Sequence, residues 1–194
     1  EVPLQEIEQE LMNGDPYTER VFLTGADPLA VGYERMLRIL KLIKKYFPYC
    51  GCVAAYASVR SLKRYSVGEL AALHREGLRL LYVGFETGND EALAFMKKGN
   101  TAEEAIQQGR KLTEANMIFN AIIMYGIAGK DKCVENAKRT AKMLNQLKPR
   151  KIITMNLTVF QGTELASLVK EEKFAEAGVK EKMWEIKLLI ENLD

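Results

Sequence analysis

Two short turns of this sequence each place a carboxylate directly after an apolar run that is typical of a β-strand. The first turn, Gly25-Ala26-Asp27, follows the run Val21–Thr24. The second turn contains Glu86, which follows the run Leu80–Phe85 and has glycines close by on both sides. A glycine lets a ligand approach the backbone closely, and a carboxylate accepts hydrogen bonds from amino and hydroxyl groups. Both turns are therefore candidate binding sites for a polar ligand.

The remaining ionisable residues offer little acid-base chemistry. His74 is the only histidine, and no partner for it is evident in the sequence, which favours a packing role. The basic residues Arg60, Lys63 and Arg64 could bind an anionic ligand, although such a run is also typical of a solvated loop. None of the strand-like runs ends in lysine or histidine. This pattern weakens an interpretation of the chain as a hydrolase or an aldolase.

Strands and helices alternate along the chain, and this alternation must position the two carboxylates. We predict β-strands at residues 21–24, 53–57, 80–85, 119–125 and 152–159, each followed by a helical pattern. Such alternation predicts βαβ units and a parallel sheet. Because the carboxyl ends of parallel strands gather at one face, Asp27 and Glu86 are expected to lie on the same rim and face a common cleft.

Helix boundaries are marked by local signals. The segments Ser66–Glu69 and Thr101–Glu104 have the pattern of capping boxes, in which a hydroxyl and a carboxylate bind free amides of the first turn. Residues Lys180–Leu193 have the apolar spacing of an amphipathic helix. Its apolar face is predicted to contain Met183, Ile186 and Ile190.

The last predicted strand alternates polar and apolar residues. Thr154, Asn156 and Thr158 lie on one face, and the apolar residues between them lie on the other. Since helices normally cover the apolar face of a strand, the polar face is expected to point toward the interior of a barrel. We therefore expect a partly hydrated cavity or cleft beside this strand.

Taken in order, these motifs resemble those of the radical S-adenosylmethionine (SAM) superfamily, in particular its branch of coproporphyrinogen oxidase and tRNA-modifying enzymes. Each motif is weak alone, and their joint order is what makes the resemblance specific. The matching segments are Gly25–Pro28, Tyr56–Leu62, Gly84–Gly88, Lys98-Gly99, Gly126–Gly129 and Gly162–Leu165. The resemblance implies an α/β fold, a partial parallel (β/α) barrel over residues 1–170 with its first strand and cluster loop missing. Residues 171–194 would form a C-terminal helical extension.

The resemblance also implies roles for individual residues. Gly25, Ala26 and Asp27 occupy the place of a Gly-Gly-Glu-Pro segment that binds the amino group of the SAM methionine. Glu86 would contact the ribose or the amino group of SAM. The segment Gly126-Ile127-Ala128-Gly129 would pack against the adenine. Each assignment has a plainer alternative, namely a turn residue at Asp27, a helix-capping carboxylate at Glu86 and an ordinary strand-to-helix turn at Gly126 to Gly129.

An iron–sulfur oxidoreductase is the function that the resemblance implies. Such an enzyme uses SAM and a 4Fe-4S cluster to generate a 5'-deoxyadenosyl radical that abstracts hydrogen from a substrate, here unknown. The family implies an electron donor such as a flavodoxin or a ferredoxin. The sequence leaves the catalytic residues unidentified. Two alternatives stay open, a (β/α) barrel lyase or aldolase without radical chemistry, and a non-catalytic interaction domain derived from a radical SAM barrel.

The cysteines depart from the family pattern. The superfamily holds its cluster through C-x-x-x-C-x-x-C, whereas Cys50, Cys52 and Cys133 have no such spacing. An iron–sulfur cluster needs several thiolates that converge, so we expect no metal ligands in this chain. The sequence begins in a helical pattern over Pro3–Met12, and in the family the cluster loop precedes such a helix. We therefore expect a fragment cut just after the cluster loop and inactive alone.

Composition sets broad limits on the protein class. A hydrophobic content of 47% is ample for the core of a single domain of 194 residues. The formal net charge of +2 arises from nearly balanced acids and bases, which gives no indication of a nucleic acid or membrane partner. The sequence shows no signal peptide and no membrane-spanning run. A cytoplasmic location is therefore expected.

Overall fold

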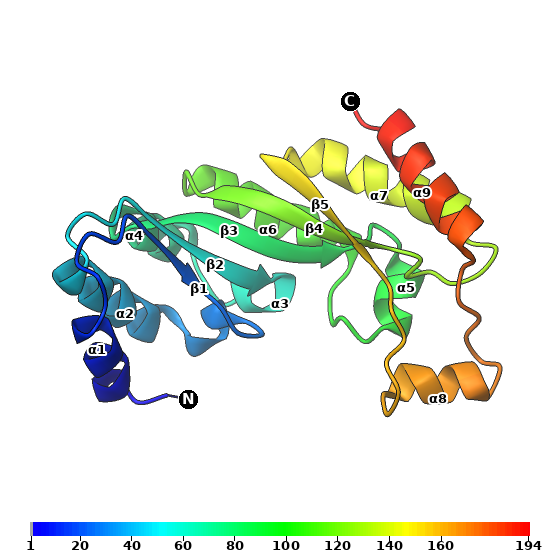
Figure 1. The fold of residues 1–194 in the computed structure, drawn as a ribbon. Coiled ribbons are helices and arrows are strands. Elements are labelled where there is room, and N and C mark those ends of the chain that lie inside the picture. The colour runs from blue at the N-terminus through cyan, green and yellow to red at the C-terminus, as the bar shows by residue number, and fades with distance from the viewer. Residues whose placement is uncertain (1) are drawn as a thin grey trace. The chain divides into compact units, whose positions relative to one another are not determined.

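A computed structural model describes residues 2–194 and contains a five-stranded sheet with helices between its strands (Figure 1). The strands are β1 (Arg20–Leu23), β2 (Cys52–Ser58), β3 (Leu78–Glu86), β4 (Ile118–Tyr125) and β5 (Lys151–Asn156). The helices are α1 (Leu4–Met12), η1 (Pro28–Val31), α2 (Tyr33–Tyr46), α3 (Val59–Leu62), α4 (Val67–Arg75), α5 (Asp90–Phe95), α6 (Ala102–Glu114), α7 (Cys133–Leu147), α8 (Glu164–Lys170) and α9 (Val179–Glu191). The predicted α/β class and its five strands are confirmed, although β5 ends earlier than predicted.

The strands are parallel and lie in sequence order, β1-β2-β3-β4-β5. Val21 of β1 pairs with Val53 of β2, and Tyr56 of β2 pairs with Tyr82 of β3. Each strand thus lies beside the next strand in the sequence. This is the arrangement of a barrel wall, in which each helix returns the chain to the start of the neighbouring strand. Among residues 2–194, none of the helices combines the length and apolar composition required to cross a bilayer.

The chain forms two compact units. The first contains the residues up to Gly84 together with Gln107–Asn120, and the second contains Phe85–Ile106 and Ala121–Asp194. The three boundaries between the units therefore fall inside β3, α6 and β4. The predicted separation of residues 171–194 as an extension stays a prediction.

The core of the first unit lies between β2 and α2. Met36, Ile39, Leu40 and Ile43 of α2 are buried, a spacing that places them on one face of the helix. On β2, Val53, Ala55 and Ala57 are buried on one face; on the other face of the sheet Ala54 is also buried and Tyr56 is exposed. The small alanines let the helices pack close to the sheet.

Three aromatic rings gather on the other face of the sheet in the first unit. Phe22, Tyr56 and Tyr82 come from β1, β2 and β3, and their ring centroids are 4.9 to 6.0 Å apart. Such tilted and edge-to-face pairs contribute about 0.5–1.5 kcal/mol each beyond the area they bury. Phe22 and Tyr56 remain partly exposed. The sheet of this unit thus has one face packed on helices and one aromatic, accessible face.

In the second unit, α9 packs along α7 (Figure 1). The helix predicted at Lys180–Leu193 is confirmed as α9; its predicted apolar face is right at Ile186, which lines a cavity beside α7, and wrong at Met183 and Ile190. Met183 and Ile190 are exposed, whereas Glu185 and Leu189 are buried. Two partners from elsewhere in the unit stabilise the buried Glu185 carboxylate, which an apolar pattern cannot anticipate. Trp184 lies on the outer side, 47% exposed, with the Lys187 ammonium 4.7 Å from the centroid of its ring.

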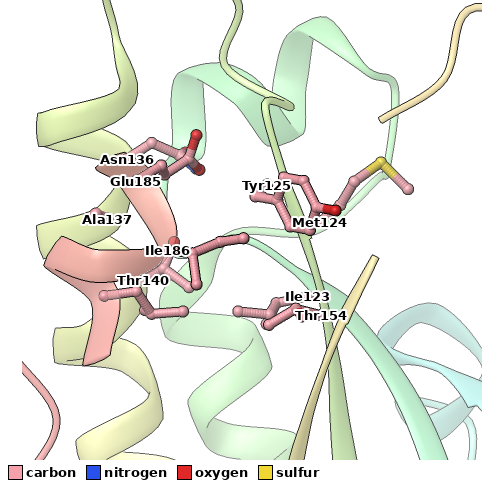
Figure 2. A pocket seen from close by; sticks show the side chains of 10 residues that line it. Ile123, Met124, Tyr125, Asn136, Ala137, Thr140, Thr154, Glu185 and Ile186 are labelled. Atoms are coloured by element: carbon pink, nitrogen blue, oxygen red, sulfur yellow. The ribbon is translucent and has the colours of Figure 1, made fainter. Parts of the chain in front are cut away.

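The predicted orientation of the last strand is also wrong at Thr154. Its side chain lines a small cavity together with Thr140 of α7 and Ile186 of α9, so it faces the helices (Figure 2). Met155, which was expected to lie under helices, is half exposed. The polar residues of α7 explain the difference, because they make the helix-covered side of β5 partly polar.

Both predicted capping boxes are confirmed. Ser66 Oγ accepts a hydrogen bond from the Glu69 N–H at 3.2 Å, and Glu69 Oε2 accepts one from the Ser66 N–H at 2.7 Å. Thr101 and Glu104 exchange the same two bonds at 3.2 and 2.8 Å. The bonds from Ser66 lower the pKa of Glu69, as expected when donors bind the charged form of a carboxyl.

Candidate functional site

The turn after β1 has an open backbone. Gly25 adopts φ 111°, a conformation that side chains disfavour, and no heavy atom lies within 4 Å of the place where a Cβ would be. Asp27 follows and η1 begins at Pro28, whose fixed φ suits the first position of a helix. Leu29 is fully buried and anchors the turn. A ligand therefore has access to the backbone at Gly25, on a turn that the buried Leu29 side chain anchors to the core.

The two carboxylate oxygens of Asp27 differ in their environment. Asp27 Oδ2 accepts a hydrogen bond from the Ser58 hydroxyl at 2.6 Å. Asp27 Oδ1 is buried and has no hydrogen-bond partner among residues 2–194. A buried acceptor without a donor costs about 1–3 kcal/mol, so native structures rarely leave one unpaired. Asp27 Oδ1 thus marks a place where a ligand could donate a hydrogen bond.

Residues that follow β2 fix this turn. Ser58 caps α3 by accepting the Ser61 N–H at 3.0 Å, and the Tyr65 hydroxyl donates to the Leu29 carbonyl at 2.6 Å. Burial raises the pKa of Tyr65 to about 12 although the Arg64 charge opposes this shift, so the Tyr65 hydroxyl remains a donor. Arg64, a member of the predicted basic run, donates to the Ala30 carbonyl at 2.9 Å. Its observed contact therefore stabilises the protein's own backbone.

Replacing Tyr65 by phenylalanine should reduce the free energy of unfolding by about 1–3 kcal/mol, because the buried Leu29 carbonyl would lose its donor. Urea unfolding of the variant measures this loss. Tyr49→Phe is the control, since Tyr49 is exposed and its substitution should change stability by less than about 0.5 kcal/mol. Equal stabilities of the two variants would contradict the role of the hydroxyl.

Glu86 ends β3 in a strained backbone conformation. Its φ is 66°, in the left-handed region, which costs an L-residue roughly 1–2 kcal/mol. Its carboxylate accepts a hydrogen bond from the Lys98 ammonium at 3.0 Å, and the side chain is only 19% exposed. The alternative role as a helix cap is wrong, because Asn89 caps α5 by accepting the Glu91 N–H at 3.1 Å. Strain of this kind often marks functional residues.

The segment Gly126 to Gly129 forms a tight turn, in which the Gly129 N–H donates to the Gly126 carbonyl at 3.1 Å. Both glycines have positive φ, and a Cβ on either would collide with Lys182 or with Phe174. The glycines therefore admit close approach of the chain's own segments. Ile127 is buried in a small apolar cluster, so this turn also provides an apolar wall.

A chain of buried polar groups links the turns after β3 and β4. Glu185 of α9 accepts the Gly126 N–H at 3.0 Å on one oxygen and the Asn136 side-chain amide at 2.7 Å on the other (Figure 2). The Asn136 carbonyl oxygen in turn accepts the Thr87 hydroxyl at 2.7 Å. Burial raises the pKa of Glu185 despite these hydrogen bonds. We call Glu185, Asn136 and Thr87 the buried relay.

The structure places the predicted site residues in separate units. Gly25, Ala26 and Asp27 lie in the first unit, whereas Glu86 and the Gly126 to Gly129 turn lie in the second. Within the second unit, the buried relay joins Gly126 to Thr87, the residue after Glu86. A rim shared by Asp27 and Glu86 stays a prediction.

Sequence reasoning missed the partners of these residues. Ser58 lies in a segment that had been matched to the family, but its bond to Asp27 was not anticipated. Lys98 was also in a matched segment, without a predicted partner. One further signal was available, because Asn136 and Thr140 interrupt the apolar stripe of α7 at a spacing of one turn.

The cysteines do not fit an iron–sulfur cluster. Within residues 2–194, no three His, Cys, Asp or Glu side chains are grouped so as to hold a metal ion. Cys50 and Cys52 belong to the first unit and Cys133 to the second. Burial and nearby carboxylates raise the pKa of the Cys133 thiol, which disfavours the thiolate that a metal requires. We therefore assign no cluster ligand in this chain.

Comparison with known proteins identifies the family. Residues 1–141 match the Radical SAM superfamily. This chain belongs to the radical SAM superfamily. No curated protein matches the sequence. The predicted membership in this superfamily is thus confirmed, while the matched residues do not include the segment Gly162–Leu165.

Solved structures of radical SAM proteins share the fold. Coproporphyrinogen III oxidase (HemN) from Escherichia coli superimposes with a TM-score of 0.74 at 16% identity, over 97% of this chain and 43% of the oxidase. Elp3 from the archaeon Methanocaldococcus infernus gives 0.70 at 17% identity, over 88% of this chain and 44% of Elp3. Methylornithine synthase (PylB) superimposes with a TM-score of 0.67 at 17% identity, over 99% of this chain and 54% of the synthase. The chain thus spans about half the length of these structures, and the likeness shows the fold.

Proposed function

We propose that this chain provides the SAM-binding turns of a radical SAM enzyme. Family membership and the geometry of the strand-exit turns support this proposal. Gly25, Ala26 and Asp27 would hold the methionine end of SAM. Glu86 would bind the ribose or the amino group, and the turn from Gly126 to Gly129 would contact the adenine.

The observation that carries the proposal is the buried, unpartnered Asp27 Oδ1 beside the open backbone at Gly25. An ammonium group such as that of methionine carries three N–H donors and a positive charge, so it suits an orphan carboxylate oxygen. The Ser58 hydroxyl occupies the other oxygen and orients the carboxylate. Ala26 replaces a second glycine of the family segment, which leaves the Gly25 backbone as the more open contact.

Glu86 and the apolar turn would complete the site. The Glu86 carboxylate is paired with Lys98, and its remaining acceptor capacity suits a ribose hydroxyl or an amino group. Ile127 of the Gly126 to Gly129 turn is buried among apolar residues, an environment compatible with a flat base such as adenine. These residues would bind and orient SAM and exclude water from it.

SAM held by these residues would supply the 5'-deoxyadenosyl group that abstracts hydrogen from a substrate, once one electron from a reduced cluster has cleaved its sulfonium bond to release methionine. Because the cysteines do not fit the cluster, we assign no electron-transfer step to residues of this chain. An oxidoreductase role, a flavodoxin or ferredoxin as electron donor and a cytoplasmic setting are part of the proposal.

Substitution of Asp27 by asparagine tests the proposal. The amide would replace a carboxylate oxygen by an N–H donor, so SAM affinity should fall by about 10- to 100-fold, the worth of a charge-assisted hydrogen bond. Isothermal titration calorimetry of SAM with this chain and its variant measures the change. Asp15→Asn is a matched control, because Asp15 lies in an exposed turn of the same unit.

Two results would contradict this assignment. One is wild-type SAM affinity in a folded Asp27→Asn variant. The other is an equal loss of affinity in Asp15→Asn, which would indicate a nonspecific effect of charge. Circular dichroism of each variant verifies folding before the titration.

A further inference from the structure

Glu185 is an ionisable residue that the proposed SAM contacts do not use. Its side chain lies on α9 and is only 4% exposed. Buried carboxylates are rare unless they are paired or fully hydrogen bonded. Glu185 is bound by two donors that come from different elements, Gly126 after β4 and Asn136 on α7. Burying this carboxylate costs desolvation free energy, and its two hydrogen bonds connect α9 to two other parts of the unit.

One oxygen of Glu185 fixes the turn after β4. It accepts the Gly126 N–H at 3.0 Å. Gly126 has φ 78° and packs against the side chain of Lys182, which, like Glu185, belongs to α9. Gly126 is itself buried, so solvent cannot serve as an alternative acceptor for its N–H. The peptide plane at the start of this turn is therefore oriented by α9.

The other oxygen reaches the turn after β3 through Asn136. Asn136 is 2% exposed and accepts the Thr87 hydroxyl, and Thr87 Oγ1 also accepts the Asn89 N–H at 3.1 Å. Thr140, one turn along α7, accepts the Gly88 N–H at 3.1 Å. The backbone directly after Glu86 is thus bound by polar side chains, and these lead to Glu185.

The cavity beside the Glu185 carboxylate leaves room for one water molecule at most. The cavity next to Glu185, lined also by Tyr125 and Thr154, has a volume of about 10 Å³ (Figure 2). A cavity needs roughly 10–15 Å³ to accommodate one water molecule, which must also find several polar partners. Removal of the carboxylate would therefore take the protein acceptor from both the Gly126 N–H and the Asn136 amide.

The charged surroundings of Glu185 come from two helices. On α9, Lys182 favours its ionised form and Glu181 disfavours it, and on α7 the Cys133 thiol is coupled to it. From β4, the Gly126 amide provides a dipole but no charge. Desolvation is the largest effect, and it raises the pKa of Glu185 above 4.5.

We propose that Glu185 is a positioning residue whose carboxylate couples the turn after β3, which follows Glu86, to the turn after β4, which begins at Gly126. The buried relay would set the spacing between the two turns. What the turns bind rests on the proposed function, whereas the coupling is a property of this chain alone. By holding both turns, α9 would determine whether they present a matched pair of contacts to SAM.

Three variants separate the two arms of the relay. Glu185→Leu removes both acceptors. Glu185→Gln can keep both arms, because its oxygen can accept the Gly126 N–H and its amide can donate to a flipped Asn136, which then donates to Thr87. Asn136→Ala removes only the arm to Thr87. Glu191→Leu is the control, as Glu191 is an exposed residue of the same helix.

Amide chemical shifts from ¹H–¹⁵N NMR of this chain provide the direct readout. In the wild type, the Gly126 and Thr87 amides should follow one common titration with a midpoint above 4.5. Both titrations should vanish in Glu185→Gln, and Asn136→Ala should remove that of Thr87 alone. A Gly126 amide that does not titrate, or a Thr87 amide that ignores Glu185, would overturn the coupling.

SAM affinity gives the second readout. Glu185→Leu should weaken binding about tenfold, the equivalent of one lost buried hydrogen bond, and Glu185→Gln should restore most of it. Glu191→Leu should bind as the wild type does. If the wild type binds no SAM while both amides still follow Glu185, the proposed function fails and the coupling stands. Unchanged affinity in a folded Glu185→Leu variant would refute the positioning role. If that variant does not fold, the NMR titrations of Glu185→Gln and Asn136→Ala decide.

Discussion

Replacing Gly88 by alanine is expected to destabilise the second unit by about 3 kcal/mol, the upper end of the usual cost of overpacking, because its neighbours are rigid. A Cβ at this position would lie 2.3 Å from the Arg139 carbonyl oxygen and 2.7 Å from its carbonyl carbon. These atoms belong to the backbone of α7, which cannot yield as a flexible side chain would. The turn after β3 would therefore have to separate from α7 and lose the Gly88 bond to Thr140.

Hydrogen exchange measures this loss within the second unit, because amides of α7 should exchange faster in the variant. Gly51→Ala is the matched control, as no heavy atom lies within 4 Å of its expected Cβ. The control should change stability by less than about 1 kcal/mol. Wild-type exchange rates in α7 of the Gly88→Ala variant would show that the close packing of this turn is not as described.

Asn136→Asp should produce the second large effect, and this effect depends on pH. The substitution places a second carboxylate where the Asn136 amide now donates to Glu185 at 2.7 Å. Two buried carboxylates at this distance cannot both ionise, so the pair must retain a proton. The loss of stability at pH 7 should reach about 3–5 kcal/mol, as for other buried charges that lack a partner.

The sign of the pH dependence follows from linkage. The folded variant would bind a proton that the unfolded chain releases at its ordinary pKa of about 4. Its stability is therefore greatest below that value and falls as the pH rises toward the raised pKa of the folded pair. Wild-type Glu185, whose pKa is also raised, contributes a smaller change of the same sign.

Urea unfolding at several pH values compares the variant with the wild type. The difference between them should be small near pH 4 and should grow toward pH 7, roughly over the range in which carboxyls with raised pKa titrate. Asn145→Asp is the control on the same helix, because Asn145 is only partly buried and its carboxylate would remain solvated. A pH-independent difference would rule out a shared proton.

Much of the fold could be predicted from local sequence patterns. The five strands follow from runs of apolar residues, and the capping boxes at Ser66 and Thr101 follow from hydrogen bonds that span three residues. Both signals depend on neighbours in sequence, so tertiary structure has little opportunity to change them. The alternation of strands and helices then indicated the parallel sheet.

The errors arose where distant residues decide the outcome. The face of α9 was assigned from Met183 and Ile190, but the buried face contains Glu185, because Gly126 and Asn136 provide its hydrogen bonds. The side of Thr154 that was expected to face a barrel interior faces α7 and α9. In the case of Glu185, polar groups outside its own helix made a polar residue acceptable in the interior, whereas Thr154 stays exposed while its side chain lines the cavity beside α7 and α9.

The candidate site was predictable in position and not in detail. Strand ends indicated Asp27 and Glu86, since carboxyl ends of parallel strands carry the loops that bind ligands. Their partners, Ser58 and Lys98, could not be inferred from spacing, as these contacts depend on how each turn folds back. The orphan oxygen of Asp27 became visible only when the burial of its individual atoms was known.

The exposed Trp184 makes α9 optically distinct from the rest of the chain. It is the single tryptophan among 194 residues, and it adjoins Glu185 on the helix that carries the buried relay. Excitation that selects the indole ring over the eight tyrosines therefore reads the environment of this helix alone. Unfolding of α9 would separate the ring from the Lys187 ammonium, which lies one turn along the same helix, and so alter the emission of the ring; ordinary fluorescence can therefore follow this one event in the unlabelled protein.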